Sequence, residues 1–339
     1  MRYLSTVYVR EHRARISHRR GSLVVSSPES KQRIPLQAID GVMILGGAQI
    51  TTDALAACVE QNVRVAALKR NGGLRFVVGG PVGGNIHLRS ALHGAVNDRD
   101  HSLDLSRVVV AGKLQNCRQV VRRWSRDHSD DSISADLQSR AEQIAGRIGR
   151  LASAESPDHV RGIEGDAARI YFGAMKRVLA NSCLDFSNRT RRPPRDPVNS
   201  MLGYCYGLLV SELIGALDAV GLDHQLGFFH RPRSGRPSLA LDLAEEFRPI
   251  VDRTVVKLIR RRQVGPESFV RTPGGAVYIE DQARVDLLKV WEAQKEAEYY
   301  HPVLRQSVER WALPSVQATL LARHLRQDIP MYPPFVLSF

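Results

Sequence analysis

The stretch from Leu226 to Arg253, LGFFHRPRSGRPSLALDLAEEFRPIVDR, joins a histidine-bearing turn to an amphipathic helix. His230 follows two phenylalanines, and the apolar spacing after the turn predicts a helix over 239–262. Asp242 and Glu245 stand three positions apart, so both side chains point to roughly the same side of that helix. Two carboxylates there repel each other unless a positive group lies between them, which makes this stretch a candidate site.

The positive group beside Asp242 and Glu245 has three candidates, namely Arg248, Arg253 and a divalent metal ion. A solvated acidic face paired with arginines is the alternative explanation of the segment. Carboxylates with one imidazole suit Mg²⁺ or Mn²⁺ better than zinc, because oxygen donors dominate and no thiolate is nearby. Taken alone, His230 is better explained as a hydrogen-bonded histidine at the edge of the core.

A second acidic candidate, Glu164, lies beside the apolar stripe of a helix predicted over 157–180. Gly162 and Gly165 flank it, and each glycine inside a helix costs about 1 kcal/mol relative to alanine. Such a pair around one carboxylate suggests that something bulky approaches the backbone there. Close packing of a neighbouring helix is the equally physical alternative.

Helical periodicity dominates the chain beyond Ser102, whereas the first ninety or so residues show period-two strand patterns. The strands are expected at Tyr3–Val9, Ser22–Ser26, Arg33–Ile39, Val63–Leu68 and Leu74–Val78, with a helix at Thr52–Gln61. Further helices are expected at 103–127, 157–180, 198–220, 239–262, 281–299 and 314–326, and around the stripe Leu137, Ala141, Ile144, Ile148 and Leu151. Short spacings between the strands favour antiparallel hairpins. We therefore expect an α+β chain with a β-rich domain over 1–90, a linker over 91–102 and a larger all-α domain over 103–339.

Charge points to a polyanionic partner, because 48 Lys and Arg against 35 Asp and Glu give +13, with a pI near 10.0. Arginine predominates in the basic runs at 10–20, 118–126, 189–195 and 257–262, and its planar fork suits phosphate. These runs favour nucleic acid as the partner, although any one run could be a solvated face. The candidate DNA contacts are Arg189, Arg191, Arg192, Arg195 and Arg248.

Several classes of protein are disfavoured by what the sequence lacks. It contains no GxxxxGK[ST], no GxGxxG after a strand, no HExxH and no GxSxG. Its four cysteines are widely spaced without a CxxC pair, which predicts free thiols in a reducing compartment. The uncharged run Pro197–Ser211 is shorter than a bilayer requires, so we expect a buried helix, no membrane contact and a cytoplasmic location.

The order of several segments resembles the CRISPR-associated adaptation integrases, the metal-dependent DNA endonuclease subunit of the spacer-acquisition complex. The segments are EGDAARIYF (Glu164–Phe172), DPVNSMLGYCYGLL (Asp196–Leu209), His230, SLALDLAEEFRP (Ser238–Pro249) and the late LLARHLR and YPPF. The resemblance covers the chain nearly end to end. Glu245 stands where many members have aspartate, and Gln327 stands where the resemblance leads us to expect glycine.

The resemblance implies an N-terminal β-sandwich-like domain and a helical domain that holds Mg²⁺ or Mn²⁺ on Glu164, His230 and Glu245, with Asp242 orienting His230 or a metal-bound water. It further implies a homodimer that pairs with the small ferredoxin-like CRISPR adaptation protein. This complex would bind double-stranded and branched DNA and join 3′-hydroxyl ends of captured fragments to a CRISPR array. A non-catalytic DNA-binding scaffold and a general metal-dependent DNA nuclease stay open as alternatives.

Overall fold

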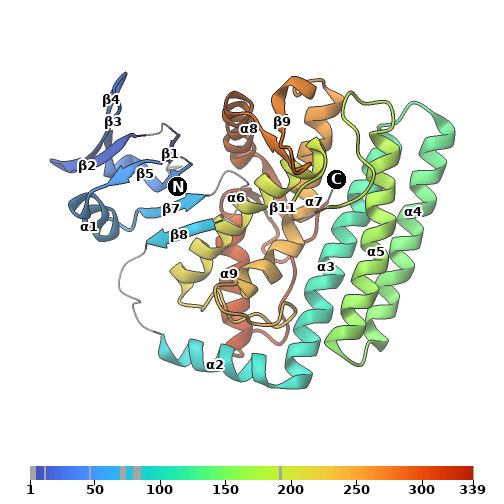
Figure 1. Ribbon diagram of the computed structural model, residues 1–339. Helices are drawn as coiled ribbons and strands as arrows, with labels where there is room; N and C mark the ends of the chain where they lie inside the picture. Colours follow the sequence, from blue (N-terminus) through green and yellow to red (C-terminus); the bar gives the residue numbers. More distant parts are fainter. Residues whose placement is uncertain are drawn as a thin grey trace. The chain divides into compact units, whose positions relative to one another are not determined.

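The computed structural model describes residues 5–10, 13–45, 47–68, 74–78, 85–190 and 193–338. The chain divides into two compact units, Met1–Gly84 and Asn85–Phe339 (Figure 1). The expected linker over 91–102 is wrong, because it lies in helices α2 (Ile86–Asn97) and α3 (Arg99–Arg126). Asn85 and Asp98 start these helices by accepting hydrogen bonds from backbone N–H groups of the first turn, which ends the first unit before residue 85 rather than at 90.

The described residues of the first unit form two four-stranded sheets and one α-helix. One sheet has the order β1 (Ser5–Val9), β5 (Ile39–Ile44), β7 (Arg64–Leu68) and β8 (Leu74–Val78); the other has the order β4 (Lys31–Pro35), β3 (Ser22–Ser26), β2 (Arg15–Arg19) and β6 (Gln49–Ile50). Buried residues from both sheets and from α1 (Thr52–Glu60) form one cluster that includes Ile16, Leu23 and Val65. The two sheets therefore share a single core, as the layers of a β-sandwich do.

The positions of the strands were predicted more accurately than their pairing. β3 and β8 have the predicted bounds, and the predicted strand Arg33–Ile39 is instead divided among β4, a short 3₁₀ turn and β5. The preference for antiparallel hairpins is only half right: β1, β5 and β7 are parallel, as are β2 and β6, while β2–β3–β4 and β7–β8 are antiparallel. The glycine-rich segment over 79–84, whose composition indicates a domain boundary, lies outside the described residues.

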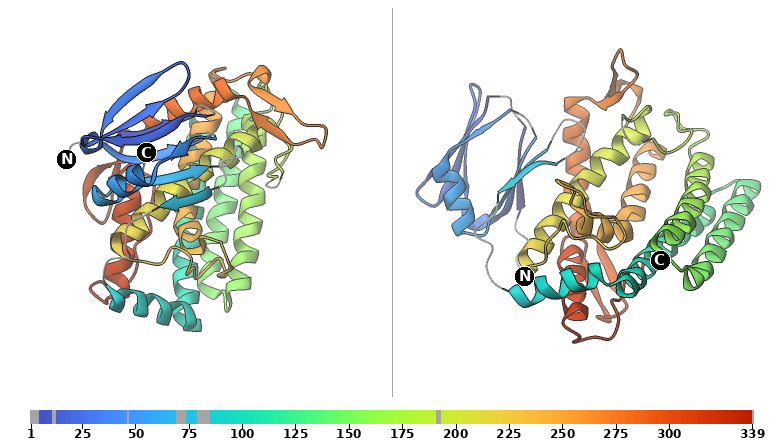
Figure 2. Two further views of the ribbon diagram at one scale, coloured as in Figure 1. Left: turned by 60° about the vertical axis from the view of Figure 1, so that its left-hand side comes forward. Right: turned by 60° about the horizontal axis from the view of Figure 1, so that its bottom comes forward.

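The second unit is built on long helices. They are α3, α4 (Asp131–Arg150), α5 (Pro157–Val178), α6 (Pro197–Val220), α7 (Ser238–Arg260), α8 (Asp281–Ala293) and α9 (Leu313–Leu325). α3 packs against α4, α5 and α7, and α6 packs against α7 and α9; Figure 2 shows α3, α4 and α5 side by side in both further views. The predicted stripe on α4 is confirmed, since Leu137, Ala141 and Ile144 are fully buried.

α6 is the one helix of the described residues that is long and apolar enough to cross a membrane, judged by length and composition alone. In its most apolar window 72% of the residues are buried inside the protein. The packing partners are α7 and α9. α6 is therefore the core helix of the second unit, as predicted for this segment.

The expectation of an all-α second domain is wrong. Two hairpins interrupt the helices, β9 (Phe269–Arg271) with β10 (Val277–Ile279) and β11 (Glu298–His301) with β12 (Gln306–Glu309). The helix predicted over 281–299 ends at Ala293, and its last residues form strand β11. These strands have only three or four residues each, too few for a period-two pattern to stand out.

The C-terminal segment closes the core beside α7. Phe335 is fully buried, and its ring stacks on Phe247 with centroids 5.5 Å apart. The Asn116 amide on α3 donates to the carbonyls of Glu246 and Phe335, both at 2.8 Å, and its oxygen accepts from Leu337 N at 2.7 Å. Helix α7 is thus held between α3 and the tail.

Candidate metal centre

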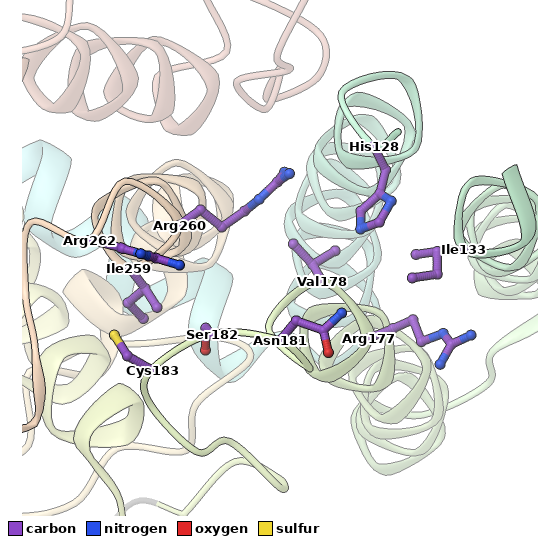
Figure 3. A pocket seen from close by; sticks show the side chains of 10 residues that line it. All are labelled: His128, Ile133, Arg177, Val178, Asn181, Ser182, Cys183, Ile259, Arg260 and Arg262. Carbon is purple, nitrogen blue, oxygen red and sulfur yellow. The ribbon is translucent and has the colours of Figure 1, made fainter. Parts of the chain in front are cut away.

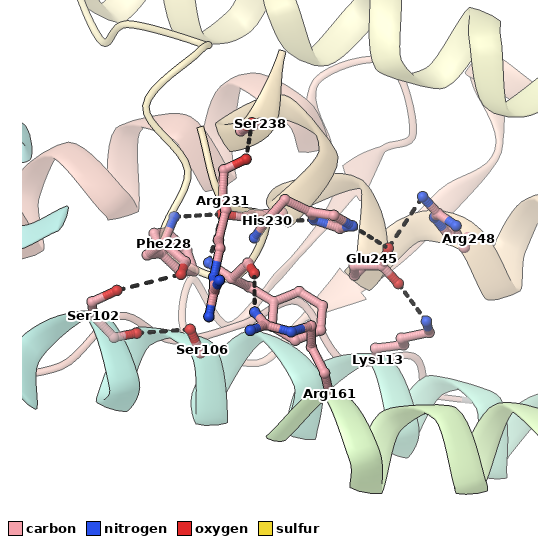
Figure 4. Close-up of polar contacts among 12 residues, drawn as sticks. Ser102, Ser106, Lys113, Arg161, Phe228, His230, Arg231, Ser238, Glu245 and Arg248 are labelled. Atoms are coloured by element: carbon pink, nitrogen blue, oxygen red, sulfur yellow. Dashed lines mark hydrogen bonds and ion pairs between the residues drawn. The ribbon is translucent and has the colours of Figure 1, made fainter. Parts of the chain in front are cut away.

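Two helices and one loop carry the predicted site residues, and Figure 4 shows His230 and Glu245 among them. Glu164 lies on α5, and Asp242 and Glu245 lie on α7. His230 lies in the loop between α6 and α7. α3 packs against both α5 and α7 and contributes a residue that the sequence analysis missed, Lys113.

Asp242 organises the loop that carries His230. Its carboxylate has no exposed surface and accepts hydrogen bonds from the backbone N–H groups of Phe228 (2.8 Å), Phe229 (3.1 Å) and His230 (2.8 Å). The same carboxylate lies 2.7 Å from His230 Nδ1. Burial raises the pKa of Asp242, and the contact with His230 opposes that rise. With Nδ1 engaged, the ring turns Nε2 toward Glu245, which is 3.9 Å away from it.

The backbone of this loop is also held through its carbonyl groups. Ser102 Oγ donates to Phe228 O at 3.3 Å, and the Arg161 guanidinium donates to Phe229 O at 3.1 Å (Figure 4). Gly227 leaves no room for a side chain, because an added Cβ would lie 2.7 Å from both His230 O and the Ser238 backbone. The loop is therefore a fixed platform for the imidazole rather than a free connection.

Glu245 is buried between two cations. Only 3% of its side chain is exposed; Oε2 pairs with the Lys113 ammonium, and Oε1 lies 3.1 Å from the Arg248 guanidinium. Burial alone would raise the pKa of Glu245, but Arg248 and Lys113 outweigh burial and lower the pKa to about 2. The carboxylate is thus ionised at neutral pH, and Arg248, one of the three candidates for the positive group, pairs with Glu245.

Lys113 links Glu245 to Glu164. Its ammonium pairs with Glu164 Oε1 as well as with Glu245 Oε2. Burial opposes the charge on Lys113, yet Glu164 and Glu245 raise its pKa above the ordinary lysine value, so the group is a cation. Lys113 therefore lies between Glu164 and Glu245, a pair of carboxylates for which the sequence predicted no cation.

Glu164 is the more open of the two glutamates, with 17% of its side chain exposed. Its flanking glycines face empty space, because a Cβ added at Gly162 or Gly165 would meet no atom within 4 Å. Close packing of a neighbouring helix does not explain these glycines. The structure leaves open space along the backbone of α5 beside Glu164.

Arg248 also contacts the buried ring of Tyr206, which is hydrogen-bonded to the buried Asp252. Its guanidinium lies 4.9 Å from the centre of the Tyr206 ring, and Tyr206 OH donates to Asp252. Burial raises the pKa of Asp252 to about 6, and the hydrogen bond from Tyr206 opposes that rise. These contacts fix the position of Arg248 against Glu245.

The donor set fits a hard divalent cation. Two carboxylates and one imidazole are oxygen-rich ligands of the kind that Mg²⁺ and Mn²⁺ take. Glu245 Oε2 is buried but accepts no well-aligned hydrogen bond. The other oxygen of this carboxylate, Oε1, lies 3.9 Å from His230 Nε2, a distance that two ligands of a single ion can have. Among the described residues no three ligands are already gathered in metal-binding geometry, because Lys113 stands between Glu164 and Glu245.

The five arginines predicted to contact DNA have different surroundings. Arg248 is 13% exposed and faces Glu245, and Arg189 donates to Asn199 Oδ1 at 2.7 Å and lies 5.4 Å from the Tyr206 ring centre. Arg195 is exposed and donates to Gly274 O at 2.9 Å. Arg191 and Arg192 lie outside the described residues. DNA contact by these residues stays a prediction.

A signal for Lys113 was present in the sequence. Val109 lies four residues before it and Cys117 four residues after it, and both are buried, so Lys113 is on the apolar stripe of α3. A lysine at such a position needs a partner, because an unpaired buried charge is costly. The partner could not be identified without the fold.

A strand-rich unit followed by a helical unit with a histidine–carboxylate cluster defines a class of two-unit proteins whose acidic site lies on the helices. A family model described as "CRISPR associated protein Cas1" matches residues 7–293. The chain belongs to the Cas1 family, and the resemblance proposed from the sequence is confirmed.

Similar proteins include a "CRISPR-associated endonuclease Cas1 1" of Moorella thermoacetica, 38% identical over 338 residues that cover 98% of each chain. A "CRISPR-associated endonuclease Cas1 2" of Rhodospirillum rubrum is 40% identical over 342 residues, again 98% of each chain. Among solved structures, a casposase bound to integration product has a TM-score of 0.83 at 24% identity, over 97% of this chain and 92% of the other. A Cas1 protein from Thermotoga maritima has a TM-score of 0.80 at 18% identity, over 99% of both chains. These structures share the fold of this chain.

Proposed function

We propose that this protein is a metal-dependent DNA endonuclease and strand transferase that joins 3′-hydroxyl ends of captured foreign DNA to a CRISPR array. The observation that carries this proposal is the convergence of Glu164, His230 and Glu245 from three segments of a Cas1-family chain with a net charge of +13. The relatives named as CRISPR-associated endonucleases support DNA cleavage, and the casposase bound to integration product supports joining.

Glu164, His230 and Glu245 would hold the Mg²⁺ or Mn²⁺ ion, which would polarise the reacting phosphodiester and activate the attacking hydroxyl. Asp242 keeps His230 in the orientation that leaves Nε2 free. Arg248 keeps Glu245 ionised and is itself held by the Tyr206 ring. The residues around the site thus keep its donor atoms charged and oriented before DNA arrives.

Lys113 acts in this proposal as a resident cation. When the site lacks a metal ion, its ammonium neutralises Glu164 and Glu245, which would otherwise repel each other in a buried place. Glu164 and Glu245 would release the ammonium from one or both carboxylates when they hold a divalent ion. The side chain of lysine is long and flexible enough to move aside within the site.

The open space beside Gly162 and Gly165 would admit the DNA backbone next to Glu164. The basic runs of the chain would follow the phosphates without reading bases, as an enzyme that accepts fragments of many sequences requires. Arg189, Arg191, Arg192 and Arg195 are retained as candidate contacts to double-stranded or branched DNA.

The working assembly would be a homodimer joined by a small ferredoxin-like adaptation protein, in the cytoplasm. Support for a partner comes from a Cas6-RT-Cas1–Cas2 complex, in which one chain has a TM-score of 0.83 to this protein at 19% identity. This chain matches 36% of that longer chain, so the comparison concerns the Cas1 portion. The homodimer and the small ferredoxin-like partner are therefore proposals for this chain.

One observation favours a second candidate, a non-catalytic DNA-binding scaffold. Lys113 and Arg248 already neutralise the acidic cluster, as they would if its role were only structural. A scaffold would bind DNA with a steep salt dependence but without any dependence on divalent metal.

A strand-transfer assay separates the two candidates. The substrates are a short duplex with free 3′-hydroxyl ends and a supercoiled plasmid that carries a CRISPR repeat, incubated with Mg²⁺, Mn²⁺ or EDTA and with the small partner present. We expect metal-dependent joining by the parent protein and its loss in Glu164→Ala. Glu142→Ala, which removes an exposed glutamate of α4, is the matched control and retains joining. Joining by Glu164→Ala at the parental rate, or DNA binding without joining or cleavage in any metal, contradicts the proposal.

A further inference from the structure

A basic cavity of about 500 Å³ lies at the far ends of the helices that carry the candidate metal centre (Figure 3). Four basic side chains line it: His128 after α3, Arg177 in the last turn of α5, Arg260 in the last turn of α7, and Arg262 just beyond α7. No Asp or Glu is among the lining residues, and no acidic partner of the three arginines is found among the described residues.

Part of the cavity lining is apolar. Ile133, Val178 and Ile259 line the cavity and are each less than 10% exposed. Asn181 and Ser182 add hydrogen-bonding groups at its edge. Apolar and cationic side chains in one cavity suit a nucleotide unit, whose base can lie against the apolar side chains while its phosphate contacts guanidinium groups.

Arg262 is the residue that sets this cavity apart from an ordinary helix end. Arg177 and Arg260 lie in last turns, where a cation also interacts favourably with the helix dipole. Arg262 lies beyond the helix in the left-handed region, with φ of +53°, and its N–H donates to Ile259 O at 2.9 Å. Gln263 N donates to Leu258 O at 3.0 Å, which completes a helix-ending motif that normally has glycine at this position. Glycine would take this conformation without strain, and the arginine that stands there instead lines the cavity.

The cavity also lies along the path from the candidate metal centre. Val178 follows Glu164 by fourteen residues on the same helix, and Ile259 follows Glu245 by fourteen, so each step is about 21 Å at the usual helical rise. Phosphates of one strand in a duplex are about 3.4 Å apart along the axis, so this distance corresponds to roughly six of them. A strand of modest length can reach both places.

We propose that this cavity binds a nucleotide unit of the DNA strand whose phosphodiester reaches the candidate metal centre, with its phosphate on Arg260 and Arg262. The inference rests on the proposed function for the identity of the ligand as DNA. It adds a binding site about six phosphates away from the reacting bond, where a strand is held before and during reaction.

The thiol of Cys183 can report whether the cavity is occupied. Cys183 lines the cavity and is exposed, whereas Cys58, Cys117 and Cys205 are buried, so a maleimide modifies Cys183 first. Its rate of modification is measured in EDTA on the full chain, with and without a single-stranded oligonucleotide of roughly 12 nucleotides, long enough to cover both sites. Fluorescence anisotropy of the same oligonucleotide gives its dissociation constant. We expect the bound oligonucleotide to slow modification about fivefold or more.

Arg262→Gly is the decisive variant, with Arg305→Gly as its matched control. Arg305 is also an exposed arginine with φ of +53°, but it lies in the β11–β12 turn outside the cavity. Glycine relieves the backbone at both positions, so both variants are expected to melt a few degrees higher than the parent. Only Arg262→Gly should lose protection of Cys183, weaken DNA binding several-fold and lower the salt slope by about one.

Three results overturn the proposal: full protection of Cys183 in Arg262→Gly, no protection while the oligonucleotide is bound, or equal protection by inorganic phosphate at the oligonucleotide concentration. The last result identifies a site for free anions instead of a strand. Because the readout needs no metal and no turnover, it is independent of catalysis. Protection without joining would reject the proposed function alone, and joining without protection would reject this cavity alone.

Discussion

Two neighbouring glutamates on α7 show how the surroundings of a buried carboxylate decide its role. Glu245 faces the candidate metal centre, where Arg248 and Lys113 lower its pKa to about 2 against the effect of burial. Glu246 has no exposed surface and accepts hydrogen bonds from Tyr332 OH (2.7 Å) and Phe335 N (2.8 Å). Burial raises the pKa of Glu246 to about 7, since these donors are neutral.

The difference separates a functional carboxylate from a structural one. The charge on Glu245 is balanced by cations that a metal ion can replace, so this residue is prepared to bind one. Glu246 instead ties α7 to the C-terminal tail through hydrogen bonds, with Gln317 Nε2 as a further donor at 2.9 Å. Changes to Glu245 and to the residues of the candidate metal centre (the Glu245 side) should therefore affect metal binding and activity. Changes to Glu246 and to its contacts with the C-terminal tail (the Glu246 side) should affect stability.

The largest effect is expected from Lys113→Met. Removing one partner of a buried ion pair costs about 3–5 kcal/mol, because Glu164 and Glu245 lose their cation. Mg²⁺ or Mn²⁺ should restore much of this loss, since an ion that binds only the folded state stabilises it. Thermal unfolding with and without metal measures both quantities.

The matched control for Lys113→Met is Lys295→Met. Lys295 is also a buried lysine beside two glutamates, 2.7 Å from Glu292 and 3.7 Å from Glu212. This variant should lose stability without recovering it in metal. Equal responses of the two variants to metal would show that Lys113 is an ordinary structural lysine.

The next effect concerns pH and the Glu246 side. A folded-state pKa of about 7 against an ordinary 4.5 means that the folded protein binds the proton more tightly than the unfolded chain does. The resulting stabilisation is fully present below pH 4.5 and is lost as pH rises through 7, a change of about 3 kcal/mol. Asp252 adds a similar slope up to its pKa of about 6, so the range from pH 6 to 7 is the informative one.

Glu246→Gln should flatten the stability profile over pH 6 to 7, as followed by urea unfolding at each pH. The variant keeps an oxygen that accepts hydrogen bonds but loses the titrating group. An unchanged slope would mean that Glu246 is ionised in the folded protein, and the contrast with Glu245 would disappear.

The smallest effect is expected from Gly165→Ala on the Glu245 side. Alanine should stabilise α5 by about 1 kcal/mol, because the added Cβ meets no atom within 4 Å. Strand transfer should nevertheless fall, since the Cβ intrudes on the space beside Glu164. Gly146→Ala, at an exposed glycine of α4 with the same open surroundings, should gain stability and retain activity. Full activity in Gly165→Ala would show that DNA does not use this space.

Much of the fold was readable from periodicity, and the failures have physical reasons. Helix α4 was predicted because its apolar stripe repeats regularly, and β3 because its short run of β-branched residues is typical of a strand. Strand β2 was missed because its arginines belong to a basic run that shows no clear period-two pattern, although Ile16 within it is fully buried. The paired residues of β1 and β5 are 34 or 35 positions apart in the sequence, and no local pattern reports such a contact.

The sequence allowed us to predict the ligand residues of the candidate site, but not the lysine that neutralises them. Asp242 and Glu245 could be placed on one side by spacing, whereas their convergence with Glu164 and His230 was expected only through the family resemblance. Lys113 was missed because its partners come from two other helices. The expectation of glycine at Gln327 is explained by its φ of +66° at the end of α9, a conformation that glycine adopts without strain.

Calorimetric titration with Mn²⁺ tests the central claim most directly, in the parent protein, Glu245→Gln and Glu246→Gln. Both variants remove one buried carboxylate from the same turn of α7, so they differ in which side of the helix is changed. We predict one Mn²⁺ site per chain that is lost in Glu245→Gln and retained in Glu246→Gln. Unchanged Mn²⁺ affinity in Glu245→Gln would contradict the assignment of the metal centre.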